Sequence, residues 1–88
     1  MKIIYTSQFK KDYKRFVRQS KNMKLLKEVV KKLSKGEELP AKHKDHKLAG
    51  LWRTHRECHI KPDWLLIYRV QGQELFLERM GSHSDLFR

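Results

Sequence analysis

The chain has 88 residues and carries 21 Lys or Arg against 10 Asp or Glu, a formal net charge of +11. One small domain over residues 1–88 is expected, and at this size it buries only about 60–65% of the surface exposed on unfolding. No apolar run approaches the roughly 20 residues that span a bilayer, no apolar signal segment follows Met1, and the single cysteine excludes an intrachain disulfide. We therefore expect a cytoplasmic protein.

The positive charge is unevenly distributed along the chain. Residues 1–50 hold fifteen Lys or Arg against five Asp or Glu, whereas residues 51–88 hold six against five. This asymmetry predicts a polyanionic partner, nucleic acid ahead of a membrane surface, with an acidic protein as a compatible addition. The same lysines could also form only the solvated face of surface helices.

The first part of the chain predicts a strand followed by two helices. The β-favouring residues 3–5 predict the strand, and Ser7 is the expected N-cap of the first helix. Apolar residues recur at helical spacing at Phe9, Tyr13, Phe16 and Val17, and then at Met23, Leu26, Val29, Val30 and Leu33. Asn22 is placed to cap the second helix and Gly36 to end it, and the short link predicts an antiparallel helical hairpin.

Residues 36–51 show no periodicity, so a long loop is expected there. Loops of more than about 12–15 residues are uncommon in compact domains and are often functional. This one contains the basic sequence KHKDHK, whose two histidines among lysines suit phosphate contact. For His43 alone, a solvated basic loop is the preferred interpretation.

Residues 52–60 alternate in the manner of a strand. The face expected to meet the core carries Trp52, Thr54, Cys58 and Ile60, together with Arg56. The opposite face carries Arg53, His55, Glu57 and His59, and it is expected to be a wet face of titratable groups.

The last part of the chain predicts two more strands. Pro62 and Asp63 belong to a turn, after which the near-continuous apolar residues 64–68 predict a strand buried on both faces. Residues 71–73 close a hairpin into a final strand, Glu74 to Met80, that stops at Gly81 and leads into a loop-like tail. The expected fold is α+β, in the order β-α-α-β-β-β, with the helical hairpin on one side of a mainly antiparallel, twisted sheet.

Three residues near the end of the chain have the chemistry of an RNA-cleaving site. Arg79 offers a guanidinium that matches phosphate geometry, His83 can exchange a proton near neutral pH, and Phe87 could stack on a base. Strict alternation would place Arg79 on the core side of the last strand, so the strand has to twist or end early to free it.

Three segments resemble the signature segments of one protein family. They are DHKLAG at 45–50, RECHIKPDW at 56–64 and ERMGSHSDLF at 78–87, and they resemble the YafQ branch of the RelE/ParE toxin superfamily. The resemblance implies a small RelE-like fold and a type II toxin. Such toxins are metal-independent endoribonucleases without a cofactor that cut mRNA in the ribosomal A site. An acidic-tailed antitoxin neutralises them, and operator DNA is bound only through the toxin–antitoxin complex.

The resemblance also implies a set of site residues in this sequence. The catalytic set is His83, His46, His59, Asp63 and Arg79. The RNA-binding set is Phe87, Lys44, Lys47, Arg53 and Lys61. In metal-free cleavage the neighbouring 2′-hydroxyl attacks phosphorus, with His83 as the leading acid or base, Arg79 as the phosphate clamp and Asp63 orienting a histidine. The added Arg88 could alter how Phe87 reaches a base.

The sequence allows three other interpretations besides a nuclease. A non-catalytic module of the same fold, such as the relatives that poison DNA gyrase, would lack the histidine set. A zinc site built from three histidines and Asp63 is possible in principle, but their spacing matches no structural zinc pattern. Cys58 could act as a nucleophile, although alternation points it into the core, where a buried and inert thiol is expected.

Overall fold

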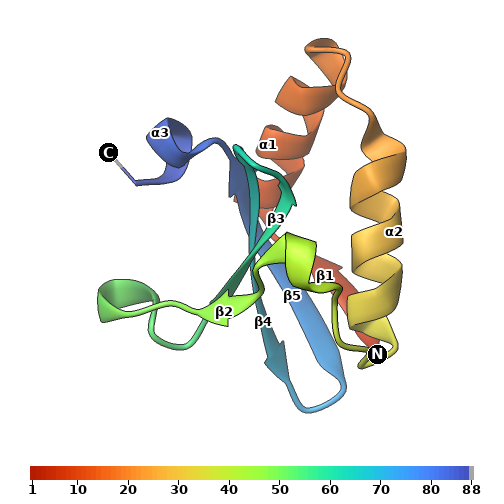
Figure 1. Ribbon diagram of the computed structural model, residues 1–88, viewed down its shortest axis with the longest axis vertical. Helices are drawn as coiled ribbons and strands as arrows, with labels where there is room; N and C mark the ends of the chain where they lie inside the picture. The colour runs from red at the N-terminus through yellow and green to blue at the C-terminus, as the bar shows by residue number, and fades with distance from the viewer. Residues whose placement is uncertain (88) are drawn as a thin grey trace.

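The computed structural model describes residues 1–87, which form a five-stranded mixed sheet with two long helices on one face (Figure 1). The strands are β1 (Lys2–Tyr5), β2 (His46–Lys47), β3 (Arg56–Lys61), β4 (Trp64–Gln71) and β5 (Glu74–Gly81). The helices are α1 (Ser7–Arg18), α2 (Met23–Ser34) and α3 (His83–Leu86), with 3-10 turns η1 (Ala41–His43) and η2 (Gly50–Trp52). The strand order is β1-β5-β4-β3-β2, and only the β1–β5 pair is parallel among the described strands. The predicted α+β class is therefore confirmed.

The ends of the two long helices follow the predicted signals with one exception. Thr6, not Ser7, caps α1, because its hydroxyl oxygen accepts the backbone N–H of Phe9 at 3.1 Å. The same hydroxyl donates to the Glu78 carbonyl at 3.0 Å and so joins the start of α1 to β5. The predicted roles of Asn22 and Gly36 are confirmed: Asn22 caps α2, and Gly36 follows it with φ of +74°. No helix of residues 1–87 is long and apolar enough to cross a bilayer.

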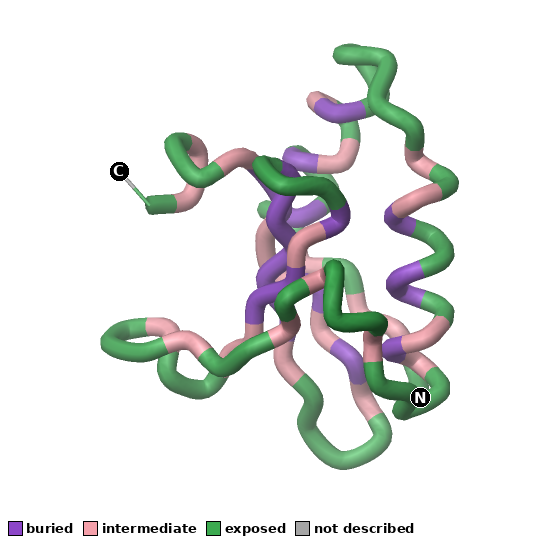
Figure 2. Tube along the Cα trace, viewed as in Figure 1, coloured by how far each residue is buried: buried purple, intermediate pink, exposed green. Residues whose placement is uncertain are grey.

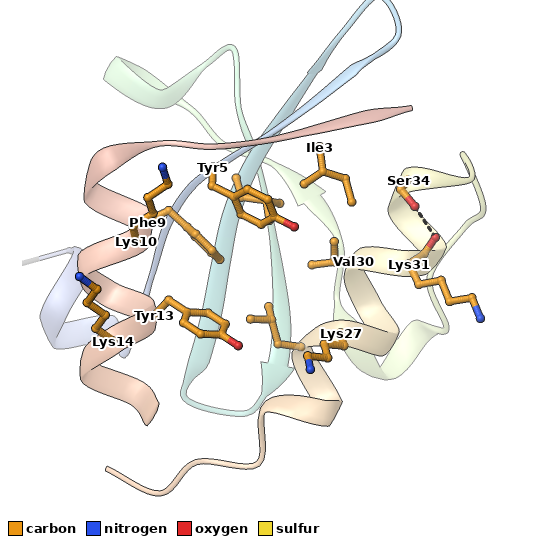
Figure 3. Close-up of a pocket in the computed structure, with 12 residues that line it drawn as sticks. Ile3, Tyr5, Phe9, Lys10, Tyr13, Lys14, Lys27, Val30, Lys31 and Ser34 are labelled. Carbon is orange, nitrogen blue, oxygen red and sulfur yellow. Dashed lines mark hydrogen bonds between the residues drawn. The ribbon is translucent and has the colours of Figure 1, made fainter. Parts of the chain in front are cut away.

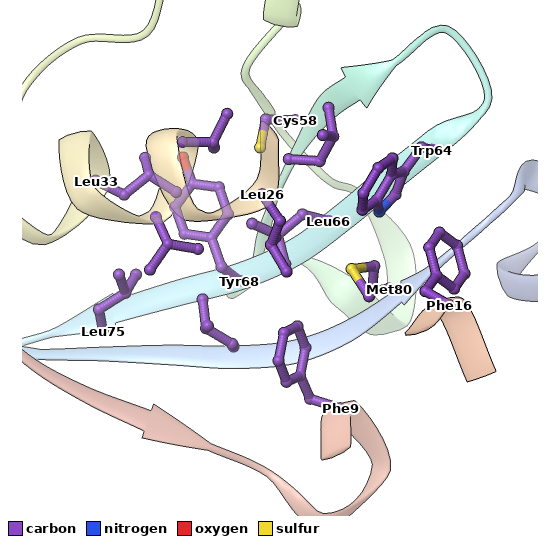
Figure 4. Packing of buried hydrophobic residues seen from close by; sticks show 14 residues of the cluster. Phe9, Phe16, Leu26, Leu33, Cys58, Trp64, Leu66, Tyr68, Leu75 and Met80 are labelled. Carbon is purple, nitrogen blue, oxygen red and sulfur yellow. The ribbon is translucent and has the colours of Figure 1, made fainter. Parts of the chain in front are cut away.

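The core lies between the two long helices and one face of the sheet (Figures 2 and 4). Phe16 packs against Trp64 with ring centroids 5.1 Å apart at one end of this layer, and Leu33 lies toward the other end. β4 is buried on both faces, as predicted. Cys58 is fully buried and its burial raises the pKa of the thiol well above the usual range, which confirms the expected inert cysteine.

The segment before β3 differs from its prediction. Strand structure starts at Arg56, and Trp52 belongs to η2, where its ring meets His55 edge-on at 4.9 Å instead of entering the core. The expected loop contains the two-residue strand β2, so the sheet has five strands where four were predicted. A pair of residues is too short to show alternation, which explains why the sequence pattern missed β2.

The face of Arg79 is decided by a bulge in β5. Tyr68 is paired with Leu77 but the next residue back, Ile67, is paired with Arg79, so Glu78 is an extra residue in β5. An inserted residue reverses the alternation beyond it. Arg79 therefore shares the face of Ile67, away from the long helices, although strict alternation predicted the core side. The strand neither ends early nor needs an unusual twist to free this side chain.

Candidate active site

The candidate site lies on the sheet face opposite the two long helices. Across this face the pairing joins His46 to Glu57, Glu57 to Ile67, and Ile67 to Arg79, so one row crosses four strands about 4.8 Å apart. Two residues further along β3 and on the same face, His59 is paired with Leu65 of β4. Ile67 and Leu65 are fully buried and form an apolar floor between the titratable groups.

Three imidazoles stand in a line on this face. The ring centroids of His46 and His59 are 6.5 Å apart, and those of His59 and His83 are 5.7 Å apart. They come from β2, from β3 and from α3, which are separated in sequence and brought together by the sheet order. The structure therefore gathers the three predicted histidines into one cluster, which we call the histidine row.

His83 is held by Asp63, which was predicted to orient a histidine without its being specified which one. Its Nδ1 lies 2.6 Å from Asp63 Oδ1, and its backbone N–H donates to the same oxygen at 2.9 Å. The backbone hydrogen bond first, and then the side-chain bond, hold the pKa of Asp63 below its usual value. An ionised Asp63 can only accept, so Nδ1 carries the proton of this bond. That fixes the tautomer and leaves Nε2 of His83 for proton exchange with a substrate.

The tail that carries His83 is a short helix instead of the expected loop. Ser82 and Asp85 form a capping box: the Ser82 hydroxyl accepts the Asp85 N–H at 3.1 Å, and Asp85 accepts the Ser82 N–H at 2.9 Å. The pattern of a serine followed three residues later by an acid was present in the sequence, but the helix is only one turn long. Its effect is to fix His83 at the start of α3.

Glu57 is the site residue that sequence reasoning missed. It was placed on a wet face, yet it is only 5% exposed, and its Oε1 lies 3.6 Å from His46 Nε2 and 3.4 Å from His59 Nε2. A buried carboxylate between two imidazoles can accept from both and so orients them. The only available signal was its position between the two histidine segments on the predicted polar face.

Arg79 reaches the site face but is engaged with a helix. Its Nε lies 2.9 Å from Oδ2 of Asp12, and its Nη2 lies 3.4 Å from Oδ1. Asp12 is 1% exposed and also accepts the Met80 N–H at 3.0 Å, beyond the point where β1 has ended. The guanidinium therefore stands at the border of the apolar floor, two strands from Glu57, and its orientation is fixed by α1.

His46 is positioned by a half-buried anchor next to it in the chain, Asp45. Asp45 Oδ1 accepts from the Tyr68 hydroxyl at 2.7 Å and from Arg56 Nε at 3.2 Å. Burial, followed by the hydrogen bond to Asp45, raises the pKa of Tyr68 above its usual value, so the hydroxyl remains a donor. Because neighbouring strand residues face opposite sides, anchoring Asp45 toward the core turns His46 toward the site.

His43 also differs from its prediction. Its Nδ1 lies 2.7 Å from the His59 carbonyl oxygen, which is an acceptor only, so the imidazole donates this bond. β2 pairs only with Arg56 and Glu57, so the His59 carbonyl lies on the part of the β3 edge that β2 does not cover. His43 is therefore a half-buried support of the strand that carries His59, and not a solvated loop residue.

The residues predicted to bind RNA are all exposed. The exposed set is Lys44, Lys47, Arg53, Lys61 and Phe87. Phe87 follows α3, its N–H donates to the His83 carbonyl at 2.8 Å, and its ring is 42% exposed. Arg88 lies outside the described residues. The site face therefore offers a cluster of proton-transfer groups, and one exposed ring follows the helix that carries His83.

The fold and the family match define the class of protein: a small α+β toxin of a type II toxin–antitoxin system. Within that class the chain belongs to the YafQ family: the family model described as "Bacterial toxin of type II toxin-antitoxin system, YafQ" matches residues 1–88.

The chain is similar to known toxins along almost its whole length. The mRNA interferase toxin YafQ of Escherichia coli K12 is 41% identical over 86 residues, which cover 97% of this chain and 94% of that protein. A copper-bound mutant toxin from Helicobacter pylori is 42% identical with a TM-score of 0.96, covering 99% of both chains. YafQ in the E. coli DinJ–YafQ complex is 40% identical with a TM-score of 0.90, covering 98% of this chain and 97% of that one.

Proposed function

We propose that this toxin is an endoribonuclease that cuts mRNA on the ribosome, in the cytoplasm, by attack of a ribose 2′-hydroxyl on the adjacent phosphate. The observation that carries the proposal is the histidine row with its two carboxylates. Asp63 holds His83 at 2.6 Å, and Glu57 lies within 3.6 Å of the other two imidazoles. A non-catalytic binder of the same fold has no need of three imidazoles spaced 5.7 and 6.5 Å apart.

The chemistry needs one group to take a proton and another to give one. A neutral imidazole removes the 2′-hydroxyl proton while the 2′-oxygen bonds to phosphorus, and a protonated imidazole supplies the proton that the departing 5′-oxygen takes up. We assign His83 the leading role, with His46 and His59 sharing proton transfer or phosphate contact. Arg79 faces the charge on phosphorus, and Phe87 stacks on an adjacent base. The products are a 2′,3′-cyclic phosphate and a 5′-hydroxyl.

We propose that no metal takes part in this reaction. Among the described residues no group of three or more His, Cys, Asp or Glu is arranged to hold a metal ion. The experiment is cleavage of ribosome-bound mRNA with and without a chelator, followed by analysis of the new ends. Equal rates and cyclic-phosphate ends are expected. A rate restored only by added metal, or ends with a 3′-hydroxyl, would contradict the mechanism.

We further propose that a cognate antitoxin docks on the opposite side of the molecule. An apolar groove of about 630 Å³ runs between β1, α1 and α2, with Phe9, Tyr13 and Val30 among the side chains that line it (Figure 3). Lysines border it on both sides, namely Lys10 and Lys14 on α1 and Lys27 and Lys31 on α2. Apolar walls with cationic borders complement an amphipathic segment flanked by acidic residues.

Reversing the charge of two lysines beside this groove is expected to weaken binding of the antitoxin. The double variant Lys10→Glu, Lys14→Glu should raise the Kd for the cognate antitoxin about tenfold or more, because attraction on one side becomes repulsion. The measurement is a binding titration without ribosomes. The matched control reverses Lys35 and Lys42, which are exposed and are not among the groove lining. Equal affinities for the two double variants would place the antitoxin elsewhere.

A further inference from the structure

The short helix that carries His83 is joined to α1 by an arginine. Arg15 lies in the last turn of α1, and its Nη2 donates to Asp85 Oδ2 at 3.3 Å and to the Met80 carbonyl at 3.4 Å. Met80 lies next to the last residue of β5, and Asp85 is the third residue of α3. One guanidinium therefore connects α1 both to the end of the last strand and to the helix that follows it. Sequence reasoning did not assign Arg15 to the site.

The Arg15 guanidinium is itself held in place on α1. Its Nη1 lies 3.8 Å from Oδ1 of Asp12, the buried carboxylate that also orients Arg79, and its Cζ lies 5.5 Å from the centroid of the Phe16 ring. α1 thus contacts Arg79 through Asp12. It contacts the helix that carries His83 through Arg15, so a single helix sets where both groups of the site lie.

Gly81 allows the close approach on which this link depends. A Cβ atom at residue 81 would lie 2.9 Å from the Cβ of Asp85, 3.0 Å from its Oδ2 and 3.3 Å from Nη2 of Arg15. Rotation of the Asp85 side chain cannot relieve the first of these contacts, because a Cβ atom is fixed by the backbone. Asp85 therefore folds back over the end of β5 and reaches Arg15 because residue 81 has no side chain.

The link between Arg15 and Asp85 matters for position more than for stability. The two side chains are 34% and 32% exposed, and an ion pair as open as this adds little to the stability of a fold. A helix of four residues does not hold its place alone, so the contacts of α3 with the rest of the domain decide where His83 lies. Asp63 holds it from the β3–β4 turn, and Arg15 holds the same helix from α1. A displacement of about 1 Å can lower a rate about 10²-fold.

We propose that Arg15 is a positioning residue for His83. By holding Asp85 against α1, it keeps the His83 imidazole in its contact with Asp63 and at a fixed place relative to the Arg79 guanidinium. Arg15 acts through α3 and not through contact with RNA. Its effect on catalysis rests on the proposed function, whereas its effect on the contact between Asp63 and His83 does not.

The first test follows the contact between Asp63 and His83 in the free toxin. Arg15→Ala should raise the pKa of Asp63 toward its usual value, because the His83 hydrogen bonds that lower it form less often once α3 is released. The measurement is an NMR titration of the Asp63 carboxyl group. The matched control is Arg18→Ala, which removes an exposed arginine from the same turn of α1 and should leave this pKa unchanged. Equal pKa values of Asp63 in the two variants would overturn the inference.

The second test is single-turnover cleavage of ribosome-bound mRNA at saturating toxin. Arg15→Ala should lower the rate about tenfold to a hundredfold, while the thermal midpoint of the protein falls by only a few degrees. In a protein that already carries His83→Gln, the same change should cost no more than about threefold, because the imidazole that Arg15 positions is gone. A wild-type rate for Arg15→Ala, or equal losses in both backgrounds, would show that Arg15 does not act through His83.

Gly81→Ala disturbs the same link without changing any charge. It should raise the pKa of Asp63 and lower the cleavage rate, as Arg15→Ala does, and wild-type values of both would count against the link. If His83→Gln cleaves at the wild-type rate, the proposed function fails. The Asp63 titration still decides the role of Arg15 in that case, because it involves no cleavage.

Discussion

Replacing His83 with Gln is expected to lower the rate of mRNA cleavage by about 10²–10⁴-fold, the usual contribution of one positioned acid or base. Glutamine keeps a side-chain N–H that can donate to Asp63, so the start of α3 should stay in place, but it cannot take or give a proton near neutral pH. The measurement is single-turnover cleavage of a ribosome-bound mRNA at saturating toxin, which reports the chemical step and not the binding of the ribosome.

The control for this variant is another histidine, His55, which lies just before β3. His55→Gln changes an imidazole that lies 3.7 Å from Glu78 and outside the histidine row, so it should cleave within a few-fold of the wild-type rate. An mRNA with a 2′-deoxyribose at the cut position should resist every variant. Wild-type cleavage by His83→Gln would remove His83 from the mechanism and leave His46 and His59 as the acid and base.

The pH dependence of Asp63 supports this assignment of roles. Its pKa is lowered by hydrogen bonds that form only in the folded protein, so the folded state favours the ionised carboxylate. That contribution is fully present above the ordinary carboxyl pKa of about 3.9 and is lost as pH falls through the lowered pKa. Asp63 therefore orients His83 throughout the neutral range, and any loss of cleavage near pH 6 belongs to other groups.

The sequence predicted the elements of the fold correctly where the apolar pattern extends over several residues. The stripes of Phe9 to Val17 and Met23 to Leu33, and the apolar run 64–68, each repeat often enough to specify a face. All three are confirmed except at Val17, near the end of α1, which is 49% exposed. The failures are short or depend on contacts from elsewhere. β2 is two residues long, and its pairing with β3 is fixed by the Asp45–Tyr68 contact across 23 residues.

In the candidate site, too, the residue types could be predicted from the sequence, whereas the contacts between distant residues could not. Residue types at 46, 59, 63 and 83 marked the polar chemistry, but nothing local indicated that Glu57 is buried between two of the histidines. The partner of Arg79 was equally hidden, because Asp12 lies 67 residues away, next to the apolar stripe of α1. A single charged residue beside an apolar stripe is expected to be exposed to solvent. Only the structure reveals that Asp12 covers the edge of β5.

Asp12→Ala is expected to destabilise the protein by about 2–4 kcal/mol. The change leaves the Met80 N–H without its acceptor at the uncovered edge of β5 and strips the partly buried Arg79 guanidinium of its partner. Each unsatisfied buried donor costs about 1–3 kcal/mol, and an unpaired charge adds to this. Domains of this size have a total stability of about 5–15 kcal/mol, so a large part of it would be lost.

Urea unfolding followed by Trp fluorescence measures this effect, with Glu28→Ala, an exposed acid on α2, as the control of equal charge change. The Asp12 variant should unfold at a clearly lower urea concentration, while the control should stay within about 0.5 kcal/mol of wild type. Asp12→Asn separates the two parts of the effect: its amide oxygen can still accept from Met80, but it no longer pairs with Arg79 as an ion. If Asp12→Ala and Glu28→Ala unfold together, the closure of the β5 edge by α1 contributes nothing to stability, and the fixed orientation of Arg79 needs another cause.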